Sequence, residues 1–185
     1  PPPAAVRDAP YFFGVAKSYP KKNIPLLIRP FNRLPAQIPP RLVLGGKPRL
    51  GEPEVLAAWR DSPAGRVLRF PDVHFRDLKA LYQAADWLIF PSLYEGFGLP
   101  VLEAMCAGTP VLTTREASIP EIGGDAVLYA DGRDEAAFAE AIRTAIAMPA
   151  AEREQLIASA RDRAATFTWA ASAGQLLQIL TEAAK

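Results

Sequence analysis

The fold is decided by the stretch Asp86-Trp-Leu-Ile-Phe-Pro-Ser-Leu-Tyr-Glu95-Gly-Phe-Gly-Leu-Pro-Val-Leu-Glu103-Ala-Met-Cys-Ala-Gly-Thr-Pro110. Its four apolar residues 87–90 form a run short enough for a strand buried on both faces, and Pro91 ends that run. Gly96 and Gly98 follow closely. Two glycines so near each other predict a loop that turns sharply and lets a ligand approach the backbone.

A helix is predicted directly after this loop. Pro100 suits the first helical turn, and we expect the helix to run to about Ala107 and to end at Gly108. Free N–H groups and the positive end of the helix dipole meet at such a helix start. The strand, the loop and the helix together therefore predict a site for an anionic ligand.

Two carboxylates frame this unit, Glu95 in the loop and Glu103 on the helix. The helix is otherwise apolar, so we expect it to be buried, and a buried ionised glutamate is costly without hydrogen bonds. Positions 99 and 107 are Leu and Ala, which excludes a basic partner one helical turn away. Two interpretations stay open: Glu103 lies at the solvent edge or pairs with a distant arginine, or it accepts hydrogen bonds from ligand hydroxyls.

Length and composition fit one domain. Half of the 185 residues are apolar, which is enough for a sizeable core. The 21 basic and 20 acidic residues nearly cancel, which argues against a nucleic-acid binder that relies on a broad positive field. The single cysteine, Cys106, cannot form an internal disulfide. A reducing compartment fits, and we expect Cys106 to be a small core residue on the buried helix.

Other segments exclude some function classes. No apolar run approaches ~18 residues, and no charged-then-apolar leader begins the chain, so we expect neither a membrane span nor a signal peptide. Residues 1–10 are proline-rich, which favours an interdomain linker. His74 is the only histidine and has no cysteine nearby. It is therefore a poor metal candidate.

Apolar and amphipathic segments alternate along the rest of the chain. Asn23 is placed to cap the first helix and Asp134 a later one. We expect strands near 11–16, 42–46, 67–70, 87–90 and 110–114 and a last one ending at 129, with helices near 24–34, 52–60, 77–85, 99–107, 134–147, 150–166 and 168–185. This order predicts an α/β fold with an open parallel sheet and helices on both faces. A GxGxxG motif is absent from the sequence, which counts against a dinucleotide dehydrogenase.

The segment Glu95-Gly-Phe-Gly-Leu-Pro-Val-Leu-Glu103, followed by Ala107-Gly-Thr-Pro-Val-Leu112, closely resembles the two-glutamate signature of one enzyme family. That family is the retaining GT-B glycosyltransferases of glycosyltransferase family 4, also called glycosyl transferases group 1. The resemblance extends from about Tyr11 to Trp169. It implies one half of a GT-B fold, with a Rossmann-like nucleotide-sugar-binding domain at 11–166 and a helix at 167–185 that crosses to a missing N-terminal domain.

The resemblance also implies roles for particular residues. The family grips the donor diphosphate with an arginine and a lysine, and the matching residues here are Lys17 and Lys22. Lys17 keeps the charge of the arginine but lacks its planar fork. Glu95 is expected near hydroxyls of the transferred sugar, and Glu103 near the ribose hydroxyls. The two lysines imply that no cofactor and no essential metal are needed.

The nucleotide would meet further residues. By the same resemblance, the backbone around Gly96, Phe97, Gly98 and Leu99 completes the phosphate cradle. Val73 and His74 stand where the family places the nucleotide base. His74 is either a base contact or a plain loop residue.

The implied activity is hexose transfer from a nucleotide-diphosphate sugar to a saccharide or lipid-linked acceptor. The segment 90–100 resembles bacterial polysaccharide mannosyltransferases, which favours GDP-mannose over UDP-sugars. The acceptor would bind the missing domain, so this half is expected to be inactive alone. The alternative is a free-standing nucleotide or sugar-phosphate binding module.

The resemblance also sets expectations about location and partners. A cytoplasmic location is expected, with any association at the inner membrane face coming from the missing half. The apolar side of the last helix is expected to be exposed. That side is a candidate surface for self-association.

Overall fold

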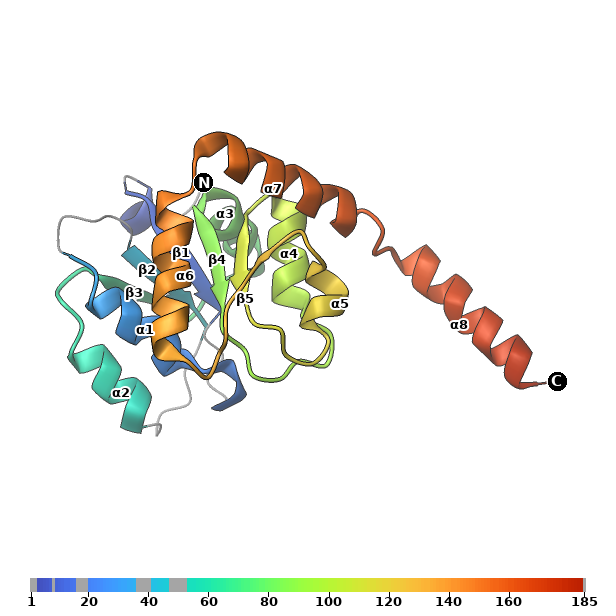
Figure 1. Ribbon diagram of the computed structural model, residues 1–185, viewed down its shortest axis with the longest axis horizontal. Coiled ribbons are helices and arrows are strands. Elements are labelled where there is room, and N and C mark those ends of the chain that lie inside the picture. The colour runs from blue at the N-terminus through green and yellow to red at the C-terminus, as the bar shows by residue number, and fades with distance from the viewer. Residues whose placement is uncertain (1–2, 8, 16–19, 36–40, 47–52, 185) are drawn as a thin grey trace.

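A six-stranded sheet forms the centre of the computed structural model, which describes all residues except 1–2, 8, 16–19, 36–40, 47–52 and 185 (Figure 1). The strand order is β3-β2-β1-β4-β5-β6, and all neighbours are parallel. The strands are β1 (Tyr11–Val15), β2 (Arg41–Gly45), β3 (Val67–Phe70), β4 (Trp87–Phe90), β5 (Val111–Thr113) and β6 (Leu128–Tyr129). The expected α/β class with an open parallel sheet is confirmed.

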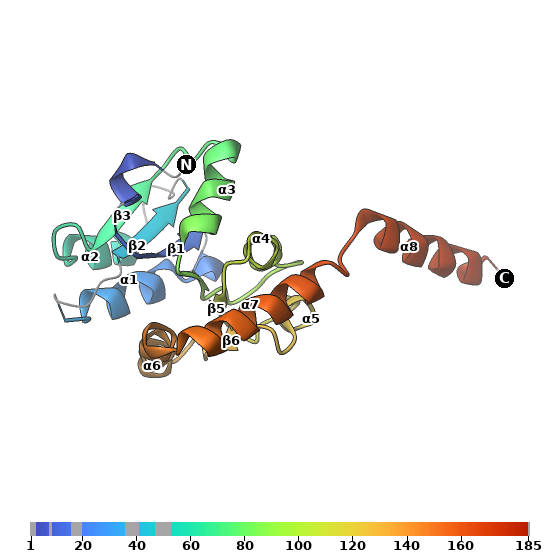
Figure 2. The ribbon, with the colours of Figure 1, turned by 90° about the horizontal axis from the view of Figure 1, so that it is seen from above.

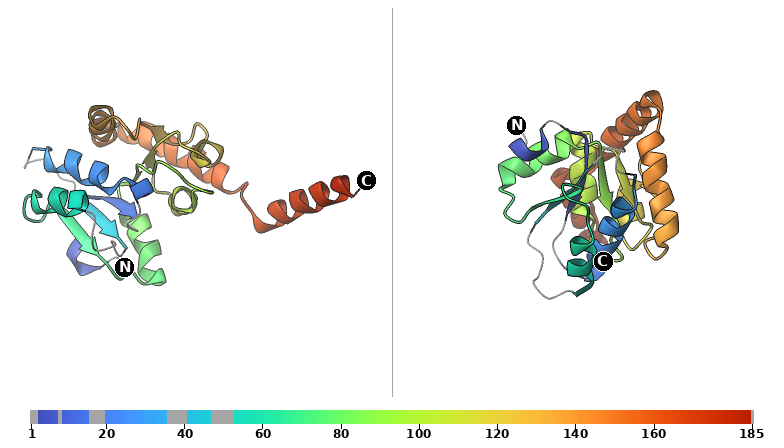
Figure 3. Two further views of the ribbon diagram at one scale, coloured as in Figure 1. Left: turned by 90° about the horizontal axis from the view of Figure 1, so that it is seen from below. Right: turned by 90° about the vertical axis from the view of Figure 1, so that its left-hand side faces the viewer.

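Helices cover both faces of the sheet, as Figure 3 shows for α3 and α6. One face carries α1 (Ile24–Asn32), α2 (Pro53–Arg60) and α6 (Glu135–Ala147). The other carries α3 (Phe75–Ala84), α4 (Leu99–Ala107), α5 (Ile119–Gly123) and the C-terminal part of α7 (Ala150–Ala164). Successive strand residues alternate between these faces: Tyr11 and Phe13 pack in one core, and Phe12 packs in the other. Because both faces are covered, the strands are mostly apolar, and the exceptions are Arg41, Arg69 and Thr113.

The strand order reverses between β1 and β4. From β1 the chain proceeds outward to β2 and β3, and it then returns to place β4 on the other side of β1. In open parallel sheets, a reversal of this kind leaves a crevice at the carboxyl ends of the two strands, where ligands bind. The segments that follow these ends are η2 (Pro20–Lys22, a 3-10 turn) and the loop 91–98. The fold thus directs the predicted anion-binding loop to the crevice.

The glycine loop and its helix have the expected bounds, since α4 runs from Leu99 to Ala107 and Gly108 ends it. Gly98 precedes the helix with φ 101°, a left-handed conformation that favours glycine. Gly96 does not share this conformation, so only one of the two glycines is needed for the turn.

The expected side-chain cap at Asn23 is wrong. Asn23 adopts a left-handed backbone conformation with φ 51°, and its side chain does not cap α1. An N-cap residue usually has extended backbone, which aims its side chain at the first helical amides. Here Nδ2 of Asn23 instead donates to the carbonyl of Gly132 at 2.7 Å. The start of α1 is thereby tied to the loop that follows β6.

The two ends of the chain differ in packing. Near the start, η1 (Ala4–Val6, a 3-10 turn) buries Val6 in the core, so part of the expected linker packs on the domain. Near the end, α8 (Trp169–Ala183) projects away from the sheet (Figure 2). Its large apolar side chains are exposed, as expected, and they are Trp169, Leu176, Leu177, Ile179 and Leu180. None of the helices in the described ranges is long and apolar enough to cross a membrane.

We expect Gly98→Ala to lower the free energy of unfolding by about 1–2 kcal/mol, because an alanine is strained in the left-handed conformation. A Cβ at this position would lie 3.8 Å from the nearest side chain, so strain and not a clash is the cause. Urea unfolding measures the effect. Gly96→Ala is the matched control, since a Cβ added there would meet nothing within 4 Å. Equal stability of the two variants would contradict the strain at Gly98.

Candidate active site

Lys22 and Glu95 meet at the crevice. Nζ of Lys22, from η2 after β1, lies 2.5 Å from Oε1 of Glu95, in the loop after β4. Both side chains are nearly buried, with 12% and 9% of their surfaces exposed. The ammonium group also lies 4.7 Å from the centre of the Phe90 ring. Because removing either partner would leave a buried unpaired charge, the two side chains depend on each other.

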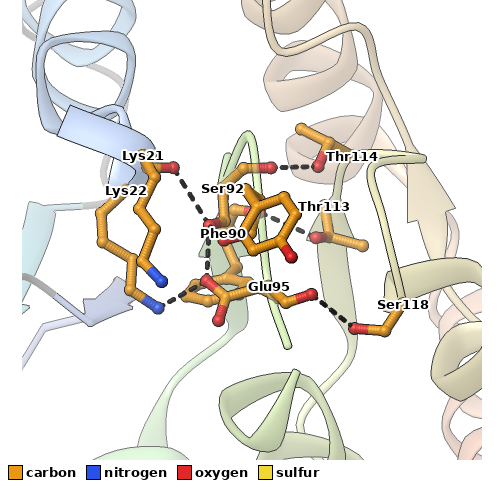
Figure 4. A network of polar contacts seen from close by, with 9 residues as sticks. Lys21, Lys22, Phe90, Ser92, Glu95, Thr113, Thr114 and Ser118 are labelled. Carbon is orange, nitrogen blue, oxygen red and sulfur yellow. Dashed lines mark hydrogen bonds and ion pairs between the residues drawn. The ribbon is translucent and has the colours of Figure 1, made fainter. Parts of the chain in front are cut away.

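Ser92 completes this cluster, which Figure 4 shows. Its side chain is fully buried, and its Oγ lies 2.5 Å from Oε1 of Glu95 and 3.1 Å from the carbonyl oxygen of Lys21. A hydroxyl has one proton, so Ser92 donates to one acceptor at a time. Oε1 of Glu95 is therefore engaged by Lys22 and Ser92, whereas Oε2 accepts no hydrogen bond from the described residues. Oε2 is the oxygen left for a ligand hydroxyl.

Side chains at the end of β5 and in the segment after it hold the main chain of the same loop (Figure 4). They donate to successive carbonyl oxygens and so fix the path of the loop between Phe90 and Glu95. The bonds are Thr113 Oγ1 to Phe90 at 2.7 Å, Thr114 Oγ1 to Ser92 at 2.5 Å and Ser118 Oγ to Glu95 at 3.0 Å. The carboxylate of Glu95 is thus presented from a fixed backbone.

Glu103 lines a second part of the candidate site, which is a groove of about 500 Å³ between α3 and α4. The side chain of Glu103 is exposed, which agrees with the interpretation that placed it at the solvent edge and not with full burial of the helix. The partner that the sequence did not reveal is Tyr82 on α3, whose hydroxyl donates to Oε2 of Glu103 at 2.8 Å. Burial raises the pKa of the Tyr82 hydroxyl, and the neighbouring carboxylate raises it further. The hydroxyl therefore stays protonated and acts as the donor.

Cys106 lines the same groove and is exposed, so its expected place in the core is wrong. The reason is the helical period of α4. Val101, Ala104 and Met105 face the sheet and are buried. Residues three and four positions apart on the opposite side face the groove. Because α4 is apolar on nearly every side, its composition did not distinguish these two faces.

The other predicted site residues have varied surroundings. Lys17 falls outside the described residues. Val73 is half-buried, and its side chain packs close to Gly45 in the core. His74 is exposed and caps α3, since its Nδ1 accepts from the amide of Arg76 at 3.3 Å. A base contact at these two positions stays a prediction.

The glycine loop itself is accessible. Gly96, Phe97 and Leu99 are exposed, and Gly98 is buried. The Phe97 ring meets the Phe167 ring edge-on, with the ring centres 6.3 Å apart. The loop thus faces solvent at the start of α4, where the expected phosphate cradle would lie.

The structure brings Lys22 and Glu95 into contact but keeps Glu103 apart from them. Within the described ranges, no hydrogen bond or ion pair joins Glu103 to either residue. Two further residues contact these carboxylates and are not evident from the sequence patterns: Ser92 at Glu95 and Tyr82 at Glu103. A serine directly after the proline that ends a buried strand is a signal for the first. Tyr82 lies at an apolar position of its helix and its ring is buried, so nothing in its local sequence indicates a partner for Glu103.

This arrangement suits a ligand that carries both negative charge and hydroxyl groups. A lysine at the crevice can attract an anion. The carboxylate of Glu95 lies beside this lysine, and the carboxylate of Glu103 lies on the helix after the same loop. Both carboxylates can accept hydrogen bonds from hydroxyls. The site is therefore suited to a phosphorylated sugar or a nucleotide.

Comparisons with known proteins agree with this chemistry. The family model described as glycosyl transferases group 1 matches residues 2–163. O-antigen chain mannosyltransferase B of Escherichia coli is 40% identical over 130 residues, which cover 67% of this chain and 33% of that protein. D-inositol 3-phosphate glycosyltransferase of Geodermatophilus obscurus is 39% identical over 122 residues, which cover 64% of this chain and 26% of that protein. The chain thus spans a third or less of the length of these two relatives.

Solved structures share the fold. Sucrose-phosphate synthase from Thermosynechococcus elongatus has a TM-score of 0.77 at 28% identity, over 95% of this chain and 46% of that one. A glycosyltransferase from Rickettsia africae has a TM-score of 0.82 at 16% identity, over 96% of this chain and 48% of that one, and this likeness shows the fold alone. With a family model that matches most of its length, the chain belongs to the glycosyl transferases group 1 family.

Proposed function

We propose that this chain is the donor-binding domain of a retaining glycosyltransferase, which moves a hexose from a nucleotide-diphosphate sugar to a saccharide or lipid-linked acceptor. The observation that carries the proposal is the contact between Lys22 and Glu95 at the reversal between β1 and β4. It places a cation and a carboxylate, from segments far apart in sequence, at the sheet edge where ligands bind. Glu103 follows from the same loop, on the first helix after it.

Each charged residue has a role in this proposal. Lys22, with Lys17, neutralises the diphosphate as the glycosidic bond breaks, since positioned cations stabilise a departing anion. Oε2 of Glu95 accepts from hydroxyls of the transferred sugar. The carboxylate of Glu103 accepts from the ribose hydroxyls. The lysines take the part that a divalent ion plays elsewhere, so the proposed transfer needs no metal.

A mannose donor is the first choice. O-antigen chain mannosyltransferase B is one of the relatives, and the serotype-specific mannosyltransferase WbdA of Escherichia coli is 32% identical over 88% of this chain. Their names support mannose as the transferred sugar, and we expect GDP-mannose as the donor, with UDP-sugars next. The acceptor groups belong to the companion domain in this proposal, so the domain alone binds the donor weakly and does not transfer it. The exposed apolar side of α8 would pack against that companion domain.

The direct test is calorimetric titration of the chain with GDP, UDP and ADP. We expect saturable binding of at least one of them, with GDP the tightest, because half of a cleft still provides the diphosphate and ribose contacts. An absence of heat for all three at millimolar concentrations would refute the proposed function.

Substitutions should separate the diphosphate contact from the ribose contact. We expect Glu103→Ala to weaken nucleoside diphosphate binding about tenfold, the effect of one hydrogen bond to a charged group, and to leave pyrophosphate binding unchanged. Lys22→Ala should weaken both ligands by similar factors, because it acts on the phosphates. Titrations of each variant with GDP and pyrophosphate measure this difference.

The neighbouring lysine provides the control for that experiment. Lys21 is exposed, and its ammonium group lies 5.7 Å from the centre of the Tyr94 ring and not at Glu95. Lys21→Ala should therefore change the affinities less than Lys22→Ala. If Lys21→Ala and Lys22→Ala lowered the affinities equally, the lysines would act by general charge attraction and not by a specific contact of Lys22. Equal losses of GDP and pyrophosphate in Glu103→Ala would contradict the ribose contact.

Cys106 gives an independent report on the groove. It is the only cysteine of the chain, it is exposed, and it lines the groove together with Glu103. We expect saturating nucleoside diphosphate to slow alkylation of this thiol by iodoacetamide, because the bound nucleoside restricts access. Pyrophosphate is the matched control and should leave the rate unchanged. Equal alkylation rates with and without nucleotide would place the nucleoside outside this groove.

A further inference from the structure

The side chain of Tyr82 is held firmly beneath the groove between α3 and α4. Only 3% of its surface is exposed. Its ring meets the Phe13 ring edge-on, with the ring centres 5.1 Å apart. Its carbonyl oxygen accepts from Oγ1 of Thr109, in the segment after α4, at 2.6 Å. The hydroxyl therefore reaches the groove from a fixed ring.

That hydroxyl has a single acceptor among the described side chains, Oε2 of Glu103 at 2.8 Å. Oε1 of Glu103 accepts no hydrogen bond in the described part of the chain. A carboxylate has about four acceptor positions on its two oxygens. The bond from Tyr82 thus leaves Oε1 and a second position on Oε2 open toward the groove.

A fixed carboxylate differs from a mobile one as a binding group. An exposed glutamate on a helix samples several rotamers, and ordering it when a ligand binds opposes that binding. The hydroxyl of Tyr82 orders Glu103 before the ligand arrives. Two open acceptor positions on adjacent oxygens match the two donors of a vicinal diol.

We propose that Tyr82 is a positioning residue that orients the Glu103 carboxylate for the ribose diol of the donor nucleotide. The inference rests on the proposed function, because it requires a nucleoside at Glu103. The proposal adds Tyr82, which lies on α3 and acts only through Glu103 on α4. If the bond merely joined α3 to α4, its loss would lower stability without changing the preference between nucleotides.

The test compares a nucleoside diphosphate with its 2′,3′-dideoxy analogue by calorimetric titration of the full 185-residue chain. Tyr82→Phe keeps the buried ring and removes the hydroxyl. We expect this variant to bind the ribose nucleotide about three- to tenfold more weakly, because the Glu103 side chain would then be ordered only when the ligand binds, with unchanged affinity for the dideoxy analogue. Glu103→Ala should remove the preference for ribose, and adding Tyr82→Phe to it should then have no further effect.

Tyr11→Phe is the matched control. Tyr11 is as deeply buried as Tyr82, and its hydroxyl donates at 2.7 Å to the carbonyl of Leu81, on the same helix as Tyr82. It does not contact Glu103. We expect Tyr11→Phe to lower the midpoint of thermal unfolding as Tyr82→Phe does and to keep the full preference for ribose.

The outcomes separate this inference from the proposed function. A preference for ribose that survives in Tyr82→Phe but disappears in Glu103→Ala would overturn the positioning role and leave the proposed function intact. A chain that binds none of the nucleoside diphosphates would refute the proposed function and the positioning role together. A reduced preference in Tyr11→Phe equal to that in Tyr82→Phe would assign the effect to general loosening of α3 and overturn the positioning role.

Discussion

The reversal of strand order between β1 and β4 is the constraint on which this site depends. Parallel strands with helical crossovers place every loop that follows a strand at one edge of the sheet. Where the crossovers change direction, two of these loops separate and leave room between them. Lys22 and Glu95 are 73 positions apart in the chain, and this topology brings their loops together. Nζ of Lys22 then lies 2.5 Å from Oε1 of Glu95.

The pairing of these residues also explains how charge is tolerated at the sheet edge. A lysine or a glutamate that loses most of its contact with water is destabilising unless an opposite charge and hydrogen bonds replace that water. Here Ser92 and the face of the Phe90 ring supply the remaining contacts. The charges of Lys22 and Glu95 therefore balance each other before any ligand is present. An incoming anion has to share Lys22 with Glu95, which favours ligands that also engage the carboxylate.

The sequence predicted the strands and the bounds of α4, because these follow from local patterns. These patterns are a four-residue apolar run, a glycine before a helix and a glycine after it. Each of them depends only on residues that are close in the sequence. The sequence did not predict which side of α4 faces solvent, because Leu, Val, Met and Ala surround Glu103 and remove the usual contrast between faces. It also missed the partner of Glu103. Tyr82 lies on another helix, and only the packing of α3 beside α4 creates that contact.

The two threonines at the end of β5 have a consequence for the acceptors at this edge. Where parallel strands diverge, the last carbonyl oxygens lose their ladder partners and would otherwise be open acceptors. Thr113 and Thr114 occupy the carbonyls of Phe90 and Ser92 with their own hydroxyls. Under the proposed function, a sugar hydroxyl near this edge would meet two main-chain oxygens that each already accept one hydrogen bond. The carboxylate of Glu95, whose Oε2 accepts no hydrogen bond from the described residues, would then be the more open acceptor.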